Sequence, residues 1–273
     1  MMRTPLSKDT QLCISLSGRP SNIGTRFHNY LYDVLGLDFI YKAFTTTDIA
    51  AAIGGVRALG IRGCSVSMPF KQDVIELVDE VEQSARAIHA VNTIVNDDGR
   101  LTASNTDYLA VQRLIAEHGL QPTQSVLLRG SGGMANAVAA AFRDNGFEHG
   151  TVIARNRETG QALAQRLGYE YASDVGTRTA DVLVNITPIG MAGGAEENDL
   201  AFEEGIIAEA LTVFDVVAMP SETPLITAAR AAGTAVITGA EVIALQAAEQ
   251  FERYTGVRPS AEQIAAASAV SRA

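Results

Sequence analysis

The sequence predicts an α/β protein made of two domains with largely parallel sheets. Strand-like apolar runs alternate with segments of helical period along almost the whole chain, which is the pattern of repeated strand–helix units. A polar stretch at 120–124, LQPTQ, precedes a second series of such units that opens with a glycine-rich turn. The 273 residues, 47% of them hydrophobic, suffice for one large domain or two modest ones.

The first part of the chain begins with a strand and then alternates. We expect strands at 11–16, 39–44 and 61–68, with a helix at about 25–35 that stops at Gly36 and a second helix within 45–60 that begins at a Thr or Asp cap. The segment after Lys71 is expected to become helical. Two short strands flank the turn at 97–99, as in a hairpin, and a helix follows at about 108–118.

The second part of the chain repeats the alternation over roughly 120 residues, the size of one compact nucleotide-binding unit. Strands are expected at the start of 125–146 and in 151–157, 181–191, 213–219 and 235–239, with helices after the glycine turn and in 158–168. A long amphipathic helix at 240–256 and a capped helix at 260–273 complete the chain.

Composition narrows the class of partner. A formal net charge of -10 and a pI near 4.9 argue against nucleic acid and against a polybasic membrane surface, so a small molecule is favoured. The first residues lack the apolar core of a signal peptide, and no apolar run approaches the roughly 18 residues that span a bilayer. We therefore expect a soluble, cytoplasmic protein with no membrane partner.

The cysteines and histidines do not form a metal-binding pattern. Cys13 and Cys64 lie in apolar strand-like runs with no Cys or His at ligand spacing, which favours buried thiols over a disulfide. The histidines, at 28, 89, 118 and 149, are scattered along the chain. We expect no metal site.

A glycine motif predicts a phosphate-binding loop. In SVLLRGSGGMA, Gly130, Gly132 and Ala135 have the spacing G-x-G-x-x-A between an apolar strand and a helix, with Ser131, Gly133 and Met134 filling the turn. Small residues there allow a tight turn and close approach of a pyrophosphate to the free amides of the helix N-terminus. An ordinary glycine-rich turn is the alternative, and the strand–loop–helix context favours binding of a dinucleotide.

The end of the next strand indicates which dinucleotide binds. An acidic residue at this point is typical of NAD sites, whereas a 2′-phosphate favours arginine. Arg155, Asn156 and Arg157 stand there, and guanidinium groups bind phosphate well. NADP is therefore favoured, while Glu158 leaves NAD possible.

Motifs in the same order along nearly the whole chain resemble the shikimate dehydrogenase family. SVSMPFK at 65–71 resembles the family's N-V-T-x-P-x-K, and NITPIGM at 185–191 resembles N-x-T-x-x-G-M near the nicotinamide. AVNT, SNTD, the glycine loop with its following Asn-Arg pair, and GAEVIALQ complete the series. The resemblance implies an α/β substrate domain at 1–106 and 240–273, a Rossmann-type NADP-binding domain at 107–239, and an active cleft between them.

The resemblance also assigns roles to individual residues. It implies a catalytic pair, Lys71 and Asp107, with Asn92 and Gln246 binding hydroxyls of a cyclic hydroxy acid. The implied cofactor-binding residues are Gly130, Ser131, Gly132, Gly133, Met134, Ala135, Asn156, Arg157, Thr187 and Gly239.

The proton-transfer role can also be argued from chemistry. Hydride transfer between a secondary alcohol and a nicotinamide requires loss or gain of the hydroxyl proton, and a lysine with a nearby carboxylate can exchange it. The alternatives are an ordinary helix-start lysine at 71 and a helix N-cap at Asp107, which is compatible with catalysis.

The substrate side departs from the family pattern. Asn22 and Gly24 stand where the family has two serines that hold the substrate carboxylate, and only Ser15, Ser17 and Ser21 offer nearby hydroxyls. Each lost hydroxyl–carboxylate bond removes on the order of 1–3 kcal/mol.

Further substitutions lie on segments expected to face the cleft: Ser65, Ser67, Tyr108 and Ala218 replace family residues. Ser15, Ser17, Asn22 and Ser67 are therefore candidate substrate-binding residues together with Asn92 and Gln246.

Three functions remain open. The favoured one is an NADP-dependent dehydrogenase, oxidoreductase in class, for shikimate or a related cyclic hydroxy acid, with a place in aromatic amino acid biosynthesis. The others are a quinate or aminoshikimate dehydrogenase that uses NAD, and a catalytically weak regulatory protein that binds cofactor. The amphipathic helices are compatible with a monomer or a homodimer.

Overall fold

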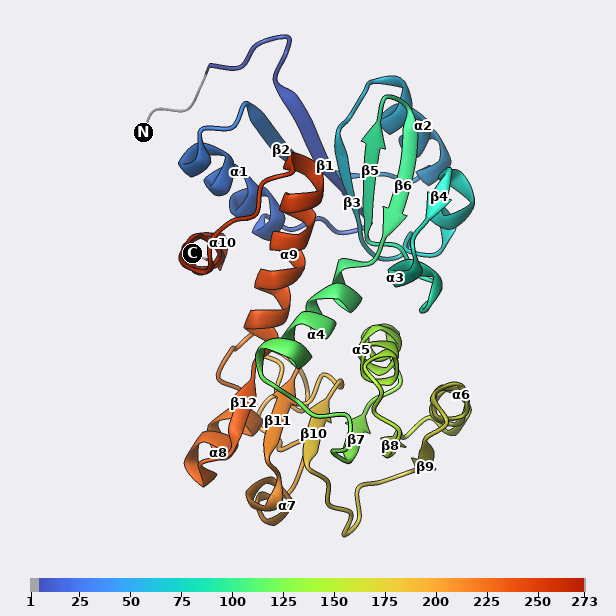
Figure 1. The fold of residues 1–273 in the computed structure, drawn as a ribbon, viewed down its shortest axis with the longest axis vertical. Coiled ribbons are helices and arrows are strands. Elements are labelled where there is room, and N and C mark those ends of the chain that lie inside the picture. The colour runs from blue at the N-terminus through green and yellow to red at the C-terminus, as the bar shows by residue number, and fades with distance from the viewer. Residues whose placement is uncertain (1–4, 273) are drawn as a thin grey trace. The chain divides into compact units, whose positions relative to one another are not determined.

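The computed structural model describes residues 5–272 as two compact units (Figure 1). The first unit contains residues 5–106 and 244–272, and the second unit contains residues 107–243. Each unit is an α/β fold around its own sheet, as the sequence predicted. Among residues 5–272, no helix is long and apolar enough to cross a membrane.

The sheet of the first unit is mixed, with strand order β2-β1-β3-β5-β6-β4. Its strands are β1 (Gln11–Ser17), β2 (Phe39–Thr45), β3 (Gly63–Val66), β4 (Glu80–Val81), β5 (Thr93–Asp97) and β6 (Arg100–Ser104). β1, β2 and β3 are parallel, whereas β5 and β6 form the predicted hairpin. Asp98 and Gly99 at its turn both have positive φ, of 51° and 92°, as a tight hairpin requires.

Helices cover both faces of this sheet. They are α1 (Ile23–Leu35), α2 (Ile49–Ala58), the 3-10 helix η1 (Asp73–Leu77), α3 (Gln83–Arg86), α9 (Gly239–Thr255) and α10 (Ala261–Arg272). Cys64 packs with α2 and η1 on one face, whereas Cys13 packs with α1, α9 and α10 on the other. Both thiols are buried, as predicted, and they belong to different cores.

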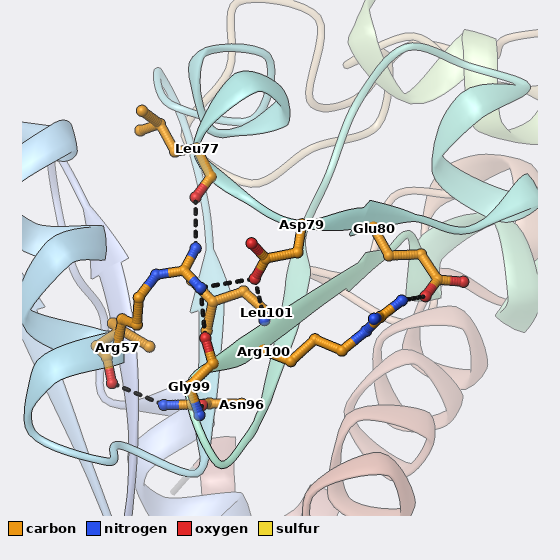
Figure 2. A network of polar contacts seen from close by, with 9 residues as sticks. Arg57, Leu77, Asp79, Glu80, Asn96, Gly99, Arg100 and Leu101 are labelled. Atoms are coloured by element: carbon orange, nitrogen blue, oxygen red, sulfur yellow. Dashed lines mark hydrogen bonds and ion pairs between the residues drawn. The ribbon is translucent and has the colours of Figure 1, made fainter.

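A polar network fixes the segment between β3 and β5 (Figure 2). The Arg57 guanidinium, at the end of α2, donates to the carboxylate of Asp79 at 2.6 Å and to the carbonyl oxygens of Gly99 and Leu77. Asp79 also accepts from the Leu101 amide at 2.7 Å. One arginine thus joins α2, the end of η1 and the β5–β6 hairpin, and it braces the segment that follows Lys71.

Replacing Asp79 with asparagine should make the first unit less stable at neutral pH but not in acid. The Arg57 hydrogen bond, followed by that from Leu101, holds the pKa of Asp79 below its usual value. Its stabilising contribution is therefore complete above the ordinary aspartate pKa, near 4, and is lost as pH falls through the lowered value. Urea midpoints of parent and variant should differ at pH 7, and the difference should be smaller at a pH well below 4. Asp9→Asn, at an exposed carboxylate beside Lys8, is the control; an equal gap at both pH values would contradict the prediction.

The second unit is a doubly wound parallel sheet with strand order β12-β11-β10-β7-β8-β9. Its strands are β7 (Val126–Arg129), β8 (Gly150–Ile153), β9 (Glu170–Ala172), β10 (Val182–Asn185), β11 (Thr212–Asp215) and β12 (Ala235–Ile237). Its helices are α4 (Thr106–Glu117), whose first residue still belongs to the first unit, α5 (Gly133–Asp144), α6 (Arg157–Leu167), α7 (Glu204–Glu209) and α8 (Pro224–Ala232). The first strand, β7, lies beside the fourth, β10, which is the Rossmann order. The strand order reverses between them, and ligands of such folds bind at that point.

The structure corrects several element predictions. α7 and α8 were not predicted, although Thr223 caps α8 and Pro224 begins it. The segment after Lys71 forms a short 3-10 helix. Since α4 begins at Thr106, the N-cap position is Asn105 and Asp107 is the second residue of the first helical turn. The interpretation of Asp107 as the N-cap is therefore wrong by two positions. A carboxylate there still favours the helix N-terminus.

Candidate functional site

The second unit contains a cavity of about 750 Å³ at the C-terminal ends of β7, β8 and β10. Five predicted cofactor residues line it: Gly130, Ser131, Gly132, Asn156 and Thr187. The others lie nearby in the chain or elsewhere in the unit. Gly133 and Met134 begin α5, Ala135 is buried in its first turn, Arg157 is the exposed first residue of α6, and Gly239 begins α9.

Gly130 is required by geometry at the turn after β7. Its φ of +127° lies outside the range that L residues adopt, and an added Cβ would lie 2.8 Å from the carbonyl oxygen of Ile186. The glycine loop therefore rests directly on the loop that follows β10. The loop leads directly into the N-terminus of α5, where helix amides favour an anion, so this arrangement fits a dinucleotide pyrophosphate.

Hydrogen bonds hold the next loop in place. Asn156 caps α6, because its side-chain oxygen accepts from the Thr159 amide at 3.1 Å. The Thr159 hydroxyl lies 2.7 Å from the hydroxyl of Ser131. The glycine loop and the start of α6 are thus joined by side chains. A Gly239 Cβ would lie only 2.4 Å from the backbone of Val217, so close packing explains this glycine.

Sequence reasoning missed Arg129, which ends β7 and lines the cavity. Its guanidinium donates to the Ala201 carbonyl oxygen, and burial lowers its pKa. Arg155 lines the same cavity and pairs with Glu196 at 3.3 Å. The signal was a cation that ends the apolar run VLLR directly before Gly130.

In the first unit, a polar row crosses the sheet on the face that α9 covers. Ser15, Ser65 and Thr93 are register partners on β1, β3 and β5, so their side chains point to one face. Gln250 of α9 donates to the Thr93 hydroxyl at 3.1 Å. Gln246 lies one helical turn before Gln250 and so shares its side of α9.

Asn92 is the best-defined candidate ligand group in this unit. Only 1% of it is exposed, and its side-chain oxygen accepts from the Thr106 amide at 2.8 Å and from the Thr93 hydroxyl at 2.8 Å. Its amide NH₂ is buried and has no hydrogen-bond partner within residues 5–272. An oriented, buried donor of this kind calls for an acceptor, and a substrate hydroxyl would supply one.

The remaining predicted substrate residues are spread over the ends of β1 and β3. Ser17 ends β1 and accepts from the Arg19 amide at 3.1 Å. Asn22 precedes α1, and its side chain does not cap the helix. The backbone amide of Ser67 donates to the Leu16 carbonyl oxygen at 2.9 Å. A Cβ on Gly24 would lie 3.5 Å from the Tyr41 hydroxyl, so the missing side chain leaves space over Tyr41.

Lys71 and Asp107 belong to different units. Lys71 follows β3, and its carbonyl oxygen accepts from the Val91 amide at 2.7 Å. Asp107 is the first residue of the second unit and directly follows Thr106, whose amide Asn92 binds. Their pairing remains a prediction. His28 is excluded as an acid or base near neutrality, because burial lowers its pKa to about 3. Residues 5–272 contain no group of His, Cys, Asp and Glu side chains suited to a metal ion.

Comparison with known proteins gives consistent matches. Residues 22–94 match a family model described as the shikimate dehydrogenase substrate binding domain. A shikimate dehydrogenase-like protein of Haemophilus influenzae is 60% identical over 267 residues, 98% of each chain.

Solved structures agree over nearly the full length. A shikimate 5-dehydrogenase-like protein superposes with a TM-score of 0.97 at 60% identity, covering 98% of this chain and 100% of that one. The Thermus thermophilus shikimate 5-dehydrogenase in complex with NADP(H) and shikimate gives 0.84 at 27% identity, with 96% and 99% covered. The Corynebacterium glutamicum quinate dehydrogenase in complex with NAD gives 0.86 at 28% identity, with 96% and 98% covered.

Proposed function

Because the chain belongs to the shikimate dehydrogenase family, we propose that it is an NADP-dependent oxidoreductase acting on shikimate or a related cyclic hydroxy acid. The observation that carries the proposal is the cavity at the switch point of the second sheet, where Gly130 rests on Ile186. When bound, NADP would supply the hydride acceptor for oxidation of a ring hydroxyl to a ketone, and NADPH would supply the hydride for the reverse reduction.

The chain's own residues handle the proton and the orientation of the substrate. Lys71 accepts the hydroxyl proton during oxidation and returns it during reduction, and Asp107 orients the lysine. Asn92 donates its unsatisfied amide NH₂ to a second hydroxyl, with Gln246 contributing from α9. The first unit is then the substrate domain and the second unit the cofactor domain.

The substrate's carboxylate end is the part of the site that differs most from the family pattern. Asn22 and Gly24 replace two hydroxyls, while Ser15 and Ser65 bring hydroxyls to the polar row near Tyr41. Burial raises the pKa of Tyr41, with Ser65 and Ser15 acting against it, so Tyr41 stays a neutral donor. With this exchange of hydroxyl groups, the site should bind shikimate more weakly than the family pattern does, or prefer a different cyclic hydroxy acid.

A quinate or aminoshikimate dehydrogenase that uses NAD is the second candidate. The exposed Glu158 in the first turn of α6 favours it, as does the similarity to the NAD complex of a quinate dehydrogenase. Steady-state assays with shikimate, quinate and aminoshikimate, each with NAD and NADP, separate the two. No turnover in any combination, with NADP still bound, would instead identify a regulatory cofactor-binding protein.

Arg157→Ala should lower the preference for NADP. Arg157 is the exposed first residue of α6, where a guanidinium can bind the 2′-phosphate in two hydrogen bonds. We expect the ratio of kcat/KM for NADP to that for NAD to fall roughly tenfold, equivalent to about 1.4 kcal/mol. Arg166→Ala, in the last turn of the same helix, is the control. Equal cofactor efficiencies in the Arg157 variant and the parent would exclude this arginine from the site.

A further inference from the structure

A buried carboxylate, Asp215, joins three segments at the C-terminal edge of the second sheet. It ends β11 and is 0% exposed. One carboxylate oxygen accepts from the Asn185 side-chain amide and from the Val217 backbone amide, both at 3.0 Å. The other accepts from the Thr223 hydroxyl at 2.7 Å. Within residues 5–272, the groups that act on the ionisation of Asp215 are the uncharged donors Thr223, Val217 and Asn185.

Asn185 passes this constraint to the loop after β10. Its NH₂ also donates to the Ile189 carbonyl oxygen at 3.1 Å, and its side-chain oxygen accepts from the Thr187 hydroxyl at 2.6 Å and amide at 3.1 Å. A carboxylate can only accept, so Asp215 fixes which end of the Asn185 amide faces it. The loop at 186–189 is therefore bonded to the side chain of Asn185, and the carboxylate of Asp215 sets the orientation of that side chain.

The same loop forms part of the cofactor cavity and is held at its far end as well. Ile186, Thr187, Pro188 and Ile189 line the cavity. Gly190 has a φ of +87°, and an added Cβ would lie 3.3 Å from the Cβ of Thr223. Thr223, which donates to Asp215, thus also packs against the end of the loop. A substitution at Asp215 would therefore alter the contacts that hold residues 186–190 at both ends.

We propose that Asp215 is a positioning residue for the dinucleotide: through Asn185 and Thr223 it holds residues 186–190 in the conformation that binds the cofactor. This rests on the proposed function of the second unit. Asp215 is fully buried and is not among the residues that line the cavity, so its effect should appear in cofactor affinity and in the KM for cofactor more than in kcat.

The protonation state of Asp215 gives the proposal a distinctive signature. Burial raises its pKa to about 6, against the effect of its hydrogen bonds from Thr223, Val217 and Asn185. Protonation turns one acceptor into a donor and competes with the Asn185 amide. Cofactor affinity should therefore weaken as pH falls from 7.5 to 5.5.

Stability should change in the opposite direction. For a carboxyl with a raised folded-state pKa, the favourable contribution is complete below its ordinary value, near 4, and is lost as pH rises through the folded value, about 6. The ionised form therefore costs stability at neutral pH. A buried charge that lowers stability while ordering a binding loop is the pattern of a functional residue.

Calorimetric titration of parent, Asp215→Asn and Asp181→Asn with NADP and with NAD tests the proposal. NAD is included because a 2′-phosphate itself ionises near pH 6. Asp181 is the matched control: it precedes the other end of β10 and accepts from the Ser125 amide and hydroxyl, both at 2.8 Å. At pH 7.5 the Asp215 variant should bind roughly tenfold more weakly than the parent, and the control should match the parent.

The pH dependence supplies the readout that a merely structural role would not give. The parent should lose affinity for both dinucleotides between pH 7.5 and 5.5, while Asp215→Asn should show no change with NAD. Thr223→Val removes a hydrogen bond to the ionised carboxylate of Asp215. The pH midpoint of the loss of cofactor affinity should therefore be higher in this variant than in the parent. Amide exchange at Thr187 and Ile189 should accelerate in Asp215→Asn.

The outcomes separate this inference from the proposed function. A parent that binds neither dinucleotide overturns both. If the parent binds and Asp215→Asn has the same affinity for NAD and the same pH dependence, the inference alone is overturned. It is also overturned if the pH midpoint of cofactor binding in Thr223→Val stays unchanged or moves to lower pH. If Asp215→Asn does not fold, the Thr223 midpoint still decides.

Discussion

Replacing Lys71 with alanine is expected to reduce turnover by roughly 10²- to 10⁴-fold, the range that a positioned acid or base contributes. The substrate hydroxyl would have to exchange its proton with water, while the cofactor cavity, formed entirely by residues 129–203 of the second unit, would be unchanged. Single-turnover measurement of hydride transfer should show the loss, and calorimetric titration with NADP should give the parent's Kd.

Two further lysine variants sharpen this experiment. Lys71→Arg keeps the charge but cannot release a proton near neutrality, so it should be nearly as slow as Lys71→Ala if proton transfer is the role. Lys42→Ala is the matched control, because Lys42 is an exposed residue of the edge strand β2 and its ammonium lies 4.9 Å from the centre of the Phe44 ring. Near-parent turnover in Lys71→Ala would remove this lysine from the mechanism.

The local features of the fold could be predicted from the sequence because short segments carry them. The G-x-G-x-x-A turn, the Asp98–Gly99 hairpin and the alternation of strand and helix all depend on residues that are neighbours in the chain. Asn156 follows the second strand of the nucleotide-binding pattern, and Thr187 was implied by the family resemblance; both line the cavity.

The features that escaped prediction depend on contacts between distant residues. Asp215 bonds to Asn185 across thirty positions, and Ser15 lies beside Ser65 only because β1 and β3 pair in that register. Sequence periodicity gives the face on which a residue lies but not its partner across the sheet. Arg129 shows the same limit: a cation at the end of an apolar strand was visible, but its place in the cavity depends on how the loop near Ala201 folds.

Gly130→Ala is expected to weaken cofactor binding by at least about a hundredfold, equivalent to roughly 2.8 kcal/mol. The φ of +127° cannot be kept by alanine, and the new methyl would meet the backbone of Ile186 at 2.8 Å. Because that contact is with backbone on the opposite cavity wall, relief requires the glycine loop and the loop after β10 to separate. Calorimetric titration with NADP measures the effect.

Gly205→Ala distinguishes a specific effect from a general intolerance of glycine replacement. Gly205 lies in α7 of the same unit, with no atom within 4 Å of an added Cβ, and alanine favours a helix. This variant should keep the parent's Kd and at least its thermal stability. Far-UV circular dichroism of Gly130→Ala should show that the sheet persists while binding is lost. Parent-like NADP affinity in Gly130→Ala would mean that the dinucleotide does not depend on the close contact between these two loops, and the cavity would then have to bind its ligand in another way.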